Sequence, residues 1–295
     1  MTSPRDVFAA LSDGITEGRW DELSALYAED AVVEHPQAVP RPGRITGRAT
    51  VHERFTGTLA ASLRLKRKNV VVHETTDPEV IVAEYDYEAE SVATGRTIQT
   101  ANIQVLRVRD GLIVHSRDYH DYLRLAVLRD GVGDLVKAYD QAPPRELSPI
   151  GPRTSSDPKS RRGVFERLVY GVCDKAGPHL AELYAEPTHV THPFQPGSAV
   201  VRTREELRTH FGQAAALGVD FEVADLVTYE GTDPEILIAE FAYQGSYGGH
   251  PVRIANIFAM RISGGLVVES RDYGDHLGVA GDLGKIPELA ARLDV

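Results

Sequence analysis

The sequence predicts an α+β protein made of two tandem cone-shaped domains, each a curved antiparallel sheet wrapped around three N-terminal helices. The first observation behind this prediction is an internal repeat, because TDPEVIVAEYDY at 76–87 returns as TDPEILIAEFAY at 232–243. The second is that ANIQVLRVRDGLIVHSRDYHDYL at 101–123 returns as ANIFAMRISGGLVVESRDYGDHL at 255–277, so the copies run in the same order. The third is that segments with helical spacing of apolar residues come before long strand-like segments in each copy.

The repeat also sets the domain boundaries. We expect domain 1 at 1–140 and domain 2 at 161–295. The stretch between them, 141–160, is rich in Pro and Ser and poor in large apolar residues, which is typical of a linker that lies on the surface. With 295 residues, the chain is long enough for two domains of common size.

Three helices are expected at the start of each copy. In the first copy, 5–17 and 20–29 carry apolar residues at helical spacing. A third helix is predicted at 49–60, and 204–217 matches it in the second copy. A short strand that contains His35 is expected between the second and third helices.

Long strands follow the helices. In the first copy they are predicted at 68–74, 79–91, 97–109 and 112–122. The sequence RDG at 109–111 is typical of the tight turn that joins the last two strands. Because residues two apart share a face of a strand, this pattern also predicts which side chains point into each cone.

Composition excludes several classes of function. The net charge is −11 and the basic runs are short, which disfavours a polyanionic partner such as nucleic acid. The single cysteine, Cys173, excludes an internal disulfide and a multi-thiolate metal site. The first residues lack the features of a secretory signal, and no apolar run approaches the roughly 20 residues that span a bilayer. We therefore expect a cytoplasmic protein without a membrane or nucleic-acid partner.

Two histidines and two aspartates keep their places in the repeat. YAEDAVVEHP and YAEPTHVTHP hold His35 and His192 at the same position, and SRDYHD and SRDYGD do the same for Asp118 and Asp272. A histidine beside a carboxylate supplies a base whose pKa lies near neutrality, so these four residues are the candidate catalytic residues. The alternative is structural, with each histidine a satisfied core side chain and each aspartate tying the sheet to the helices.

A further set of side chains shares the inward parity. The expected substrate-binding residues are Tyr85, Tyr87, Thr100, Asn102, Gln104, His120, Phe241, Tyr243, Asn256 and Phe258. A few polar groups that converge in an apolar cavity are typical of a small-molecule site. Ile254 and Phe258 stand where the first copy has Thr100 and Gln104, so the first copy is the more polar and the favoured catalytic domain.

The motifs YAED…EHP and DG.IV.SRDY.D, together with helices before strands and the length of each copy, resemble the nuclear transport factor 2-like superfamily. This superfamily includes SnoaL-like polyketide cyclases, limonene epoxide hydrolase and ketosteroid isomerase. The resemblance covers both copies and most of the chain outside the linker. It implies a ligand pocket inside each cone and association through the outer sheet faces, so we expect an intramolecular pseudo-dimer. Further pairing of the chain into a homodimer is left open.

The resemblance also implies roles for individual residues. The residue that matches His35 is the general-base aspartate in ketosteroid isomerase and a water-positioning asparagine in the epoxide hydrolase. Asp118 and Asp272 match a catalytic carboxylate of the hydrolase. Its earlier Arg and Asp positions read Tyr85 and Tyr87 here, so the water-activating triad of the hydrolase is incomplete.

These observations predict a cofactor-independent, SnoaL-like cyclase or isomerase of secondary metabolism, such as antibiotic biosynthesis. It would act by acid/base catalysis on a polyketide-like or other carbonyl-bearing small molecule, with Asn102, Gln104 or a tyrosine hydroxyl donating to the developing enolate oxygen. No metal or organic cofactor is expected, because HExxH, a cysteine cluster and a phosphate-binding loop are missing from the sequence. Two alternatives stay open: an epoxide hydrolase-like enzyme that activates water with Asp118, and a non-catalytic small-molecule binding protein.

Overall fold

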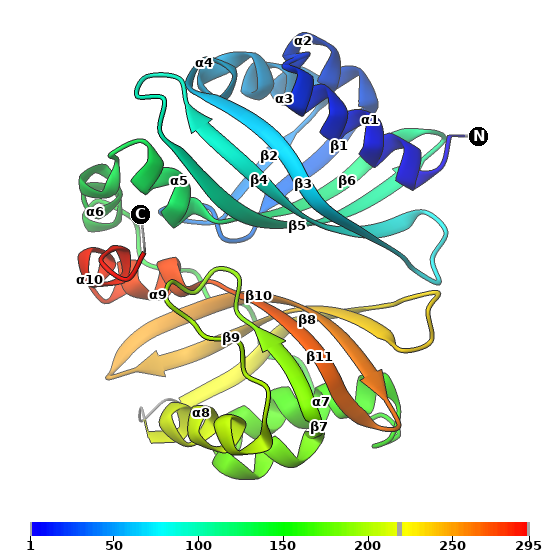
Figure 1. Cartoon of the computed structure of the whole chain (residues 1–295), viewed down its shortest axis with the longest axis vertical. Coiled ribbons are helices and arrows are strands. Elements are labelled where there is room, and N and C mark those ends of the chain that lie inside the picture. Colours follow the sequence, from blue (N-terminus) through cyan, green and yellow to red (C-terminus); the bar gives the residue numbers. More distant parts are fainter. Residues whose placement is uncertain (1, 217–219, 294–295) are drawn as a thin grey trace. The chain divides into compact units, whose positions relative to one another are not determined.

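The computed structural model describes residues 2–216 and 220–293 of the chain. The chain forms two compact units, each with its own sheet and its own hydrophobic core. Unit 1 comprises Met1–Ala142 and Ile286–Val295, and unit 2 comprises Pro143–Lys285. In each unit, helices pack on one side of a curved sheet (Figure 1). The predicted α+β class and the tandem repetition of one fold are therefore confirmed.

Unit 1 begins with helices and continues with strands. Its helical segments are α1 (Pro4–Glu17), α2 (Trp20–Leu23), η1 (Ser24–Leu26), α3 (Arg48–Arg54), η2 (Phe55–Leu59), α4 (Ala60–Ser62), α5 (Tyr122–Leu128), α6 (Val132–Asp140) and α10 (Ile286–Ala290). Its strands are β1 (Tyr27–His35), β2 (Gly43–Thr46), β3 (Leu63–Glu74), β4 (Val80–Ser91), β5 (Thr97–Arg109) and β6 (Leu112–His120).

Helix α1 shows why the first element forms and which face it buries. The Ser3 side chain accepts a hydrogen bond from the Asp6 backbone N–H, and the Asp6 carboxylate accepts one from the Ser3 N–H, so both residues satisfy donors that a helix start leaves unpaired. Val7, Phe8 and Leu11 lie on one side of the helix and are buried in the core of unit 1.

The sheet of unit 1 has the strand order β2-β1-β6-β5-β4-β3. All neighbouring pairs are antiparallel except β1 and β6, which run parallel. The prediction of a purely antiparallel sheet is wrong for this pair. In the chain, α3 and four strands (β2, β3, β4 and β5) lie between β1 and β6, and parallel neighbours need such a long connection.

The predicted helix at 20–29 is too long. Helical structure ends at Leu26, and β1 begins at Tyr27. Tyr27, Ala31 and Val33 are all buried, because side chains an even number of residues apart share a face of a strand. The register of β1 with β6 shifts between Tyr27 and Val32. The apolar residues that predicted one helical face are therefore divided between the helical segments before Tyr27 and strand β1.

Two other predicted elements are also modified. The helix expected at 49–60 consists of α3, η2 and α4, because Gly57 has non-helical dihedral angles (φ −83°, ψ −138°). The strand expected at 112–122 ends at His120, because the Asp121 side chain caps α5 by accepting from the Arg124 N–H.

Unit 2 repeats this plan. Its elements are α7 (Arg161–Cys173), η3 (Gly177–Leu183), β7 (Tyr184–Thr191), α8 (Arg204–Ala216), β8 (Asp220–Glu230), β9 (Ile236–Tyr247), β10 (His250–Ser263), β11 (Leu266–Gly274) and α9 (His276–Asp282). The sheet order is β7-β11-β10-β9-β8, and β7 and β11 are again the parallel pair. The helix predicted at 204–217 corresponds to α8, and position 217 lies outside the described residues.

The compact units differ from the predicted boundaries at two places. Most of the expected linker, 141–160, belongs to unit 2, where the Ser148 N–H donates to Gln244 and the Thr154 hydroxyl donates to Glu166. The last helix, α10, belongs to unit 1, where it packs on α6. The expected pseudo-dimer stays a prediction.

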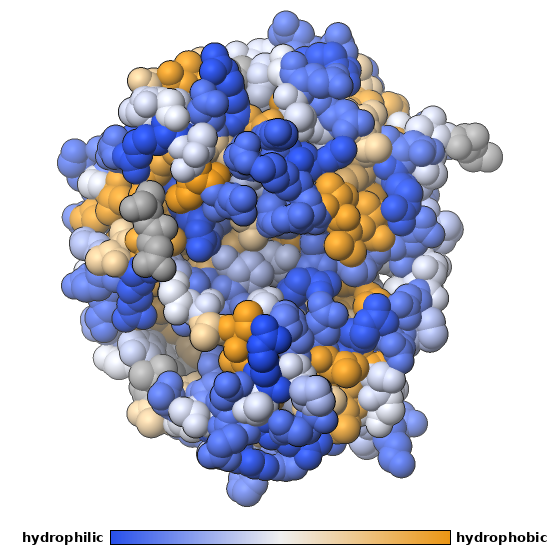
Figure 2. All heavy atoms as spheres, in the orientation of Figure 1, coloured by the Kyte–Doolittle hydropathy of each residue, from blue (hydrophilic) through white to orange (hydrophobic). Residues whose placement is uncertain are grey.

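The surface is mostly hydrophilic on the face drawn in Figure 2, and hydrophobic residues appear there in small separate groups. Among the helices of the described residues, none combines the length and the apolar character that crossing a bilayer requires.

Candidate active site

Neighbouring strands of unit 1 bring a set of polar side chains to the inner face of the sheet. Tyr85 on β4 pairs with Asn102 on β5, and Asn102 pairs with His120 on β6. Two residues along, Gln104 on β5 pairs with Asp118 on β6. Because residues two apart share a face, these side chains form two adjacent rows on the same side of the sheet.

His35 reaches these rows from the end of β1. Glu34 is the register partner of Arg117, so the next residues, His35 and Asp118, lie side by side on the opposite face. Pro36 follows and has no N–H for another ladder bond, which suits the end of the strand. His35 is only 5% exposed, and neither of its ring nitrogens has a hydrogen-bond partner in the part of the chain that the structure describes.

Asp118 is held by two donors. The Gln104 amide donates to Asp118 Oδ1 at 2.8 Å, and the Ser116 hydroxyl donates to the same oxygen. The Gln104 amide nitrogen also donates to the Ser116 hydroxyl at 3.1 Å. Since both bonds to the carboxylate reach Oδ1, they fix its orientation and leave Oδ2 for other contacts.

A chain of hydrogen bonds selects the tautomer of His120. The Asn102 amide nitrogen donates to the Thr100 carbonyl at 3.2 Å, which assigns the other end of the amide as the acceptor. His120 Nδ1 lies 2.8 Å from that acceptor, Asn102 Oδ1, so Nδ1 carries the proton. The lone pair of His120 is therefore on Nε2.

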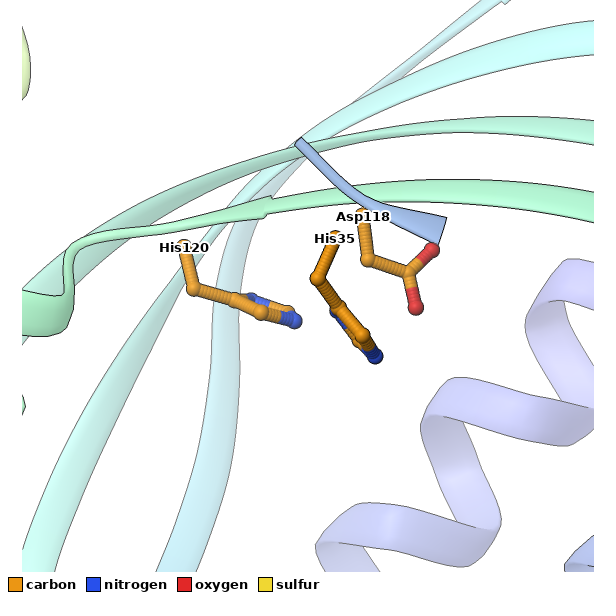
Figure 3. A group of neighbouring side chains, drawn as sticks. All are labelled: His35, Asp118 and His120. Atoms are coloured by element: carbon orange, nitrogen blue, oxygen red, sulfur yellow. The ribbon is translucent and has the colours of Figure 1, made fainter. Parts of the chain in front are cut away.

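These side chains line a cavity of about 680 Å³ inside unit 1. All eight interior residues expected in the first copy line it: His35, Tyr85, Tyr87, Thr100, Asn102, Gln104, Asp118 and His120. Figure 3 shows His35, Asp118 and His120 projecting from β1 and β6 toward one another. The rest of the wall includes Phe8, Leu11 and Val33, so polar groups converge in a mainly apolar space.

Burial controls the charge of the two cavity histidines. Burial and, to a smaller extent, the nearby Arg54 guanidinium lower the pKa of His35 to about 4. Burial also lowers the pKa of His120 to about 4, against the attraction of the Asp118 carboxylate. Both imidazoles are therefore neutral at pH 7 and offer lone pairs. The near-neutral pKa expected from the sequence is wrong for His35, because burial outweighs the neighbouring carboxylate.

The two cavity tyrosines remain protonated. Burial raises the pKa of Tyr85 well above its ordinary value, and Tyr87 adds to this shift. Burial also raises the pKa of Tyr87. The rings meet edge to face at 5.2 Å, so the two hydroxyls are neutral donors in the wall of the cavity.

Unit 2 keeps the histidine and the carboxylate. His192 Nε2 lies 4.0 Å from Asp272 Oδ2, and His192 follows β7 directly instead of ending the strand. Burial lowers the pKa of His192, while burial raises the pKa of Asp272 to about 7 against a hydrogen bond from Ser270. Each shift disfavours the charged form, so the contact is weaker than an ion pair.

Aromatic rings pack on one another in the interior of unit 2. Phe241 stands at the position of Tyr85, and Phe258 stands at the position of Gln104. The Phe241 ring packs edge to face on Phe258 and on Tyr243, with centroid distances of 5.0 Å. Asp272 therefore lacks the amide donor that Asp118 has. The expected binding residue Asn256 keeps its place, and its amide donates to the Ile254 carbonyl.

Sequence reasoning missed Arg54 in unit 1 and two histidines in unit 2. Arg54 lines the cavity of unit 1, and its spacing from Val51 on α3 and from Phe55, the first residue of η2, could have placed it on the inner face. His210 lies at the matching position of α8 and stacks on His192 at 5.2 Å.

His276 was missed because it lies two residues after Gly274, the position that matches His120 in the repeat. Gly274 stands where unit 1 has His120, and a Cβ added to Gly274 would lie 3.3 Å from His276 Nε2 and 3.2 Å from Asn256 Oδ1. The glycine thus makes room for an imidazole from the next element beside the same asparagine. The lone substitution of His by Gly gave no sign of this replacement.

Comparison with known proteins places the first unit in a family. The SnoaL-like domain family matches residues 8–116. The chain is 31% identical over 115 residues to the PhzA/B-like protein PA3332 of Pseudomonas aeruginosa, covering 38% of this chain and 79% of that protein. The chain belongs to the SnoaL-like family. Protein YesE of Bacillus subtilis is 30% identical over 102 residues, covering 34% of this SnoaL-like chain and 67% of YesE.

Solved structures give similar coverage. The SnoaL-like chain is 25% identical to a Bacillus subtilis protein of known crystal structure for which an isomerase activity has been suggested. The match covers 43% of this chain and 92% of that protein, with a TM-score of 0.41.

Proposed function

We propose that unit 1 is an enzyme that moves a proton next to a carbonyl group, as a cyclase or an isomerase. The observation that carries this proposal is His35, a buried imidazole beside Asp118 in a cavity of about 680 Å³. Among the described residues, neither of its ring nitrogens has a hydrogen-bond partner. A buried polar group without a partner is costly, so a natural protein keeps one where a ligand completes it. The size of the cavity suits a polyketide-like or other carbonyl-bearing small molecule.

The geometry supports the following steps. His35 takes a proton from the carbon next to the carbonyl, and the electron pair of the broken C–H bond moves onto the carbonyl oxygen to form an enolate. The proton then returns at another carbon in an isomerisation, or the enolate carbon attacks a second carbonyl in a ring closure and that oxygen takes the proton. The Asp118 carboxylate lies where it stabilises the imidazolium between the two steps.

The donors for the enolate oxygen can be narrowed. The Gln104 amide nitrogen already donates to Asp118 and Ser116, so it is occupied. Tyr85 and Tyr87 keep their protons, and Arg54 adds a positive charge at the cavity wall. We therefore assign stabilisation of the developing charge to these three residues.

Water-driven epoxide opening has less support. The Arg and Asp of the resembling hydrolase are replaced by Tyr85 and Tyr87, and Asp118 Oδ1 is taken by two donors. For unit 2, the packing of Phe241 and Phe258 favours an apolar binding or structural role.

Deuterium incorporation tests the proposal without knowledge of the natural substrate. The protein is incubated in D2O with a panel of 1,3-diketones, β-keto esters and polycyclic phenolic ketones, and the mass gain at the α-carbon is followed. We expect His35→Ala to slow the exchange of a bound compound by about 100-fold or more. His115→Ala is the matched control, because His115 is on β6 but faces the other side of the sheet, where it pairs with Glu34. Binding without exchange above the buffer rate would favour the non-catalytic alternative.

A further inference from the structure

Three side chains of unit 1 bring metal-binding atoms together. One donor atom from each of His35, Asp118 and His120 lies within 4.8 Å of the other two. Within residues 2–216 and 220–293, no other group of His, Cys, Asp and Glu side chains meets this distance. The three side chains come from β1 and β6 and point into one space (Figure 3).

Each of the three has a metal-binding atom without a hydrogen-bond partner among the residues that the structure describes. His120 donates from Nδ1 to Asn102, which leaves the lone pair of Nε2. The bonds to Asp118 both reach Oδ1, which leaves Oδ2. His35 is 5% exposed and has no hydrogen-bond partner at either nitrogen among the described residues. Rotating His35 toward a ligand therefore breaks no hydrogen bond.

The supporting contacts are those of a metal site. A histidine ligand usually donates its second N–H to an oxygen, as His120 does to Asn102, and a ligand carboxylate is usually hydrogen-bonded, as Asp118 is by Gln104 and Ser116. Donors around a zinc ion lie ~3.4 Å apart, so a separation within 4.8 Å closes by movements of about 1 Å per side chain.

We propose that His35, Asp118 and His120 bind one divalent transition metal ion of the zinc class, with its open coordination positions facing the cavity. Two nitrogen donors and one carboxylate suit zinc or a neighbouring transition metal better than Mg²⁺ or Ca²⁺, which prefer oxygen donors. Three protein ligands leave at least one position for water or a carbonyl oxygen. Arg54 opposes a cation in the cavity, and the negative charge of Asp118 offsets this opposition.

Occupancy has a consequence for the proposed function. A bound metal takes the lone pair with which His35 removes a proton, so the loaded site is closed to proton transfer by His35. This consequence rests on the proposed function, whereas metal binding itself does not. The metal would then act as an inhibitor of exchange.

Unit 2 provides an internal comparison. It has the pair His192 and Asp272, with Gly274 in place of the third ligand and Phe258 in place of the amide donor. His210 and His276 lie near this pair, but among the described residues they form no group whose metal-binding atoms all come within 4.8 Å of one another. We therefore expect one site per chain.

Titration calorimetry of the chelator-treated full chain with ZnCl₂ tests metal binding. We expect one site, lost or weakened by about 100-fold in His120→Gly, which copies the residue of unit 2, and weakened by about 10-fold in Asn102→Ala. His115→Ala is the control and should keep the wild-type affinity. Titration with CoCl₂ should give visible absorption bands of a nitrogen-liganded ion in the wild type and lose them in His120→Gly. Far-UV circular dichroism confirms that each variant is folded.

The outcomes are separable. Binding that is absent, or that survives unchanged in both His120→Gly and His35→Ala, overturns the metal site. Binding with the expected stoichiometry, together with zinc-sensitive deuterium exchange, supports the whole inference. Binding with exchange that zinc does not affect leaves the metal site standing and overturns His35 as the base.

Discussion

The two units hold the same histidine and the same carboxylate in different surroundings. In unit 1, Asp118 accepts from Gln104 and Ser116, and His35 faces a cavity. In unit 2, Ser270 is the one side-chain donor to Asp272 among the residues that the structure describes, and the rings of Phe241 and Phe258 pack on each other. The same histidine and aspartate therefore do not form the same site twice. The hydrogen-bond donors to the carboxylate and the cavity beside the histidine decide what chemistry the two residues can support.

The units also differ in how they hold the aspartate after the last strand. Asp275 of unit 2 caps α9 and lies 3.8 Å from Arg145, which contacts Asp282 at 2.5 Å, and the Arg145 side chain is 5% exposed. The equivalent Asp121 of unit 1 pairs with Arg124, three residues away, whose side chain is 25% exposed. The capping aspartate is thus paired with an arginine that is distant in the sequence and buried in unit 2, and with one three residues away in unit 1.

Arg145→Leu should produce the largest loss of stability. Removing the guanidinium leaves two buried carboxylates without it, and breaking such a buried pair costs about 3–5 kcal/mol. Arg124→Leu should cost less, about 1 kcal/mol, because the Arg124 side chain is partly exposed and Asp121 keeps its hydrogen bond from the backbone N–H of residue 124. Urea unfolding separates the units, since the single tryptophan, Trp20, lies in unit 1, whereas far-UV circular dichroism follows both. Equal losses in the two variants would contradict this comparison.

The pH dependence of unit 2 should change in Asp272→Asn. Burial raises the pKa of Asp272 from 3.8 to about 7, so between these values the folded unit holds a proton that the unfolded chain has released. Stability therefore falls as the pH rises through this window. Asparagine has no such proton, so the variant should be more stable than the wild type by on the order of 3 kcal/mol at pH 8 and equal to it near pH 4.

Urea unfolding followed by circular dichroism across pH 4 to 8 measures this effect. Glu205→Gln, at an exposed position of α8, is the control for loss of a charge and should follow the wild-type curve. A variant curve parallel to the wild type at every pH would refute the buried, protonated state of Asp272.

Gln104→Phe should make unit 1 resemble unit 2. The phenyl ring removes the donor to Asp118 and occupies part of the cavity, so deuterium exchange should fall by about 100-fold, equivalent to ~2.7 kcal/mol. Gln104→Glu keeps the volume but places a like charge beside Asp118, and it should slow exchange while preserving the affinity for a neutral ligand. If Gln104→Phe keeps full exchange, the cavity is not where the reaction occurs.

Much of the fold could be predicted from the sequence, because the repeat and the strand alternation are local signals. β4 and β5 lie close to the predicted 79–91 and 97–109. The helix predicted at 20–29 failed because Leu23 and Leu26 precede a strand whose buried Tyr27 continues the same helical spacing. The parallel pairing of β1 with β6 depends on contacts between distant segments, which no local pattern reports.

The site divides in the same way. Strand parity was enough to place Asn102 and Gln104 in the interior, because their strands are long and regular. The closeness of His35 to His120 follows from the pairing of two strands that are far apart in the sequence, so spacing between histidines gave no indication of it. His276 occupies the space beside Gly274 and Asn256 in which unit 1 has His120. This position depends on the course of the backbone after β11, which the composition of the segment does not predict.

The position of α10 provides the last test, because the repeat assigned 286–295 to the second domain. In the structure Ile286 is 2% exposed, and its helix packs on α6 of unit 1. Ile286→Ala should therefore destabilise unit 1, by about 2 kcal/mol, the lower end for a buried isoleucine, because a short terminal helix can adjust around the lost methyl groups. The shift should appear in the Trp20 fluorescence transition, while the exposed Glu288→Ala leaves it in place. If Ile286→Ala shifts the circular dichroism transition but leaves the Trp20 fluorescence transition unchanged, α10 belongs to unit 2.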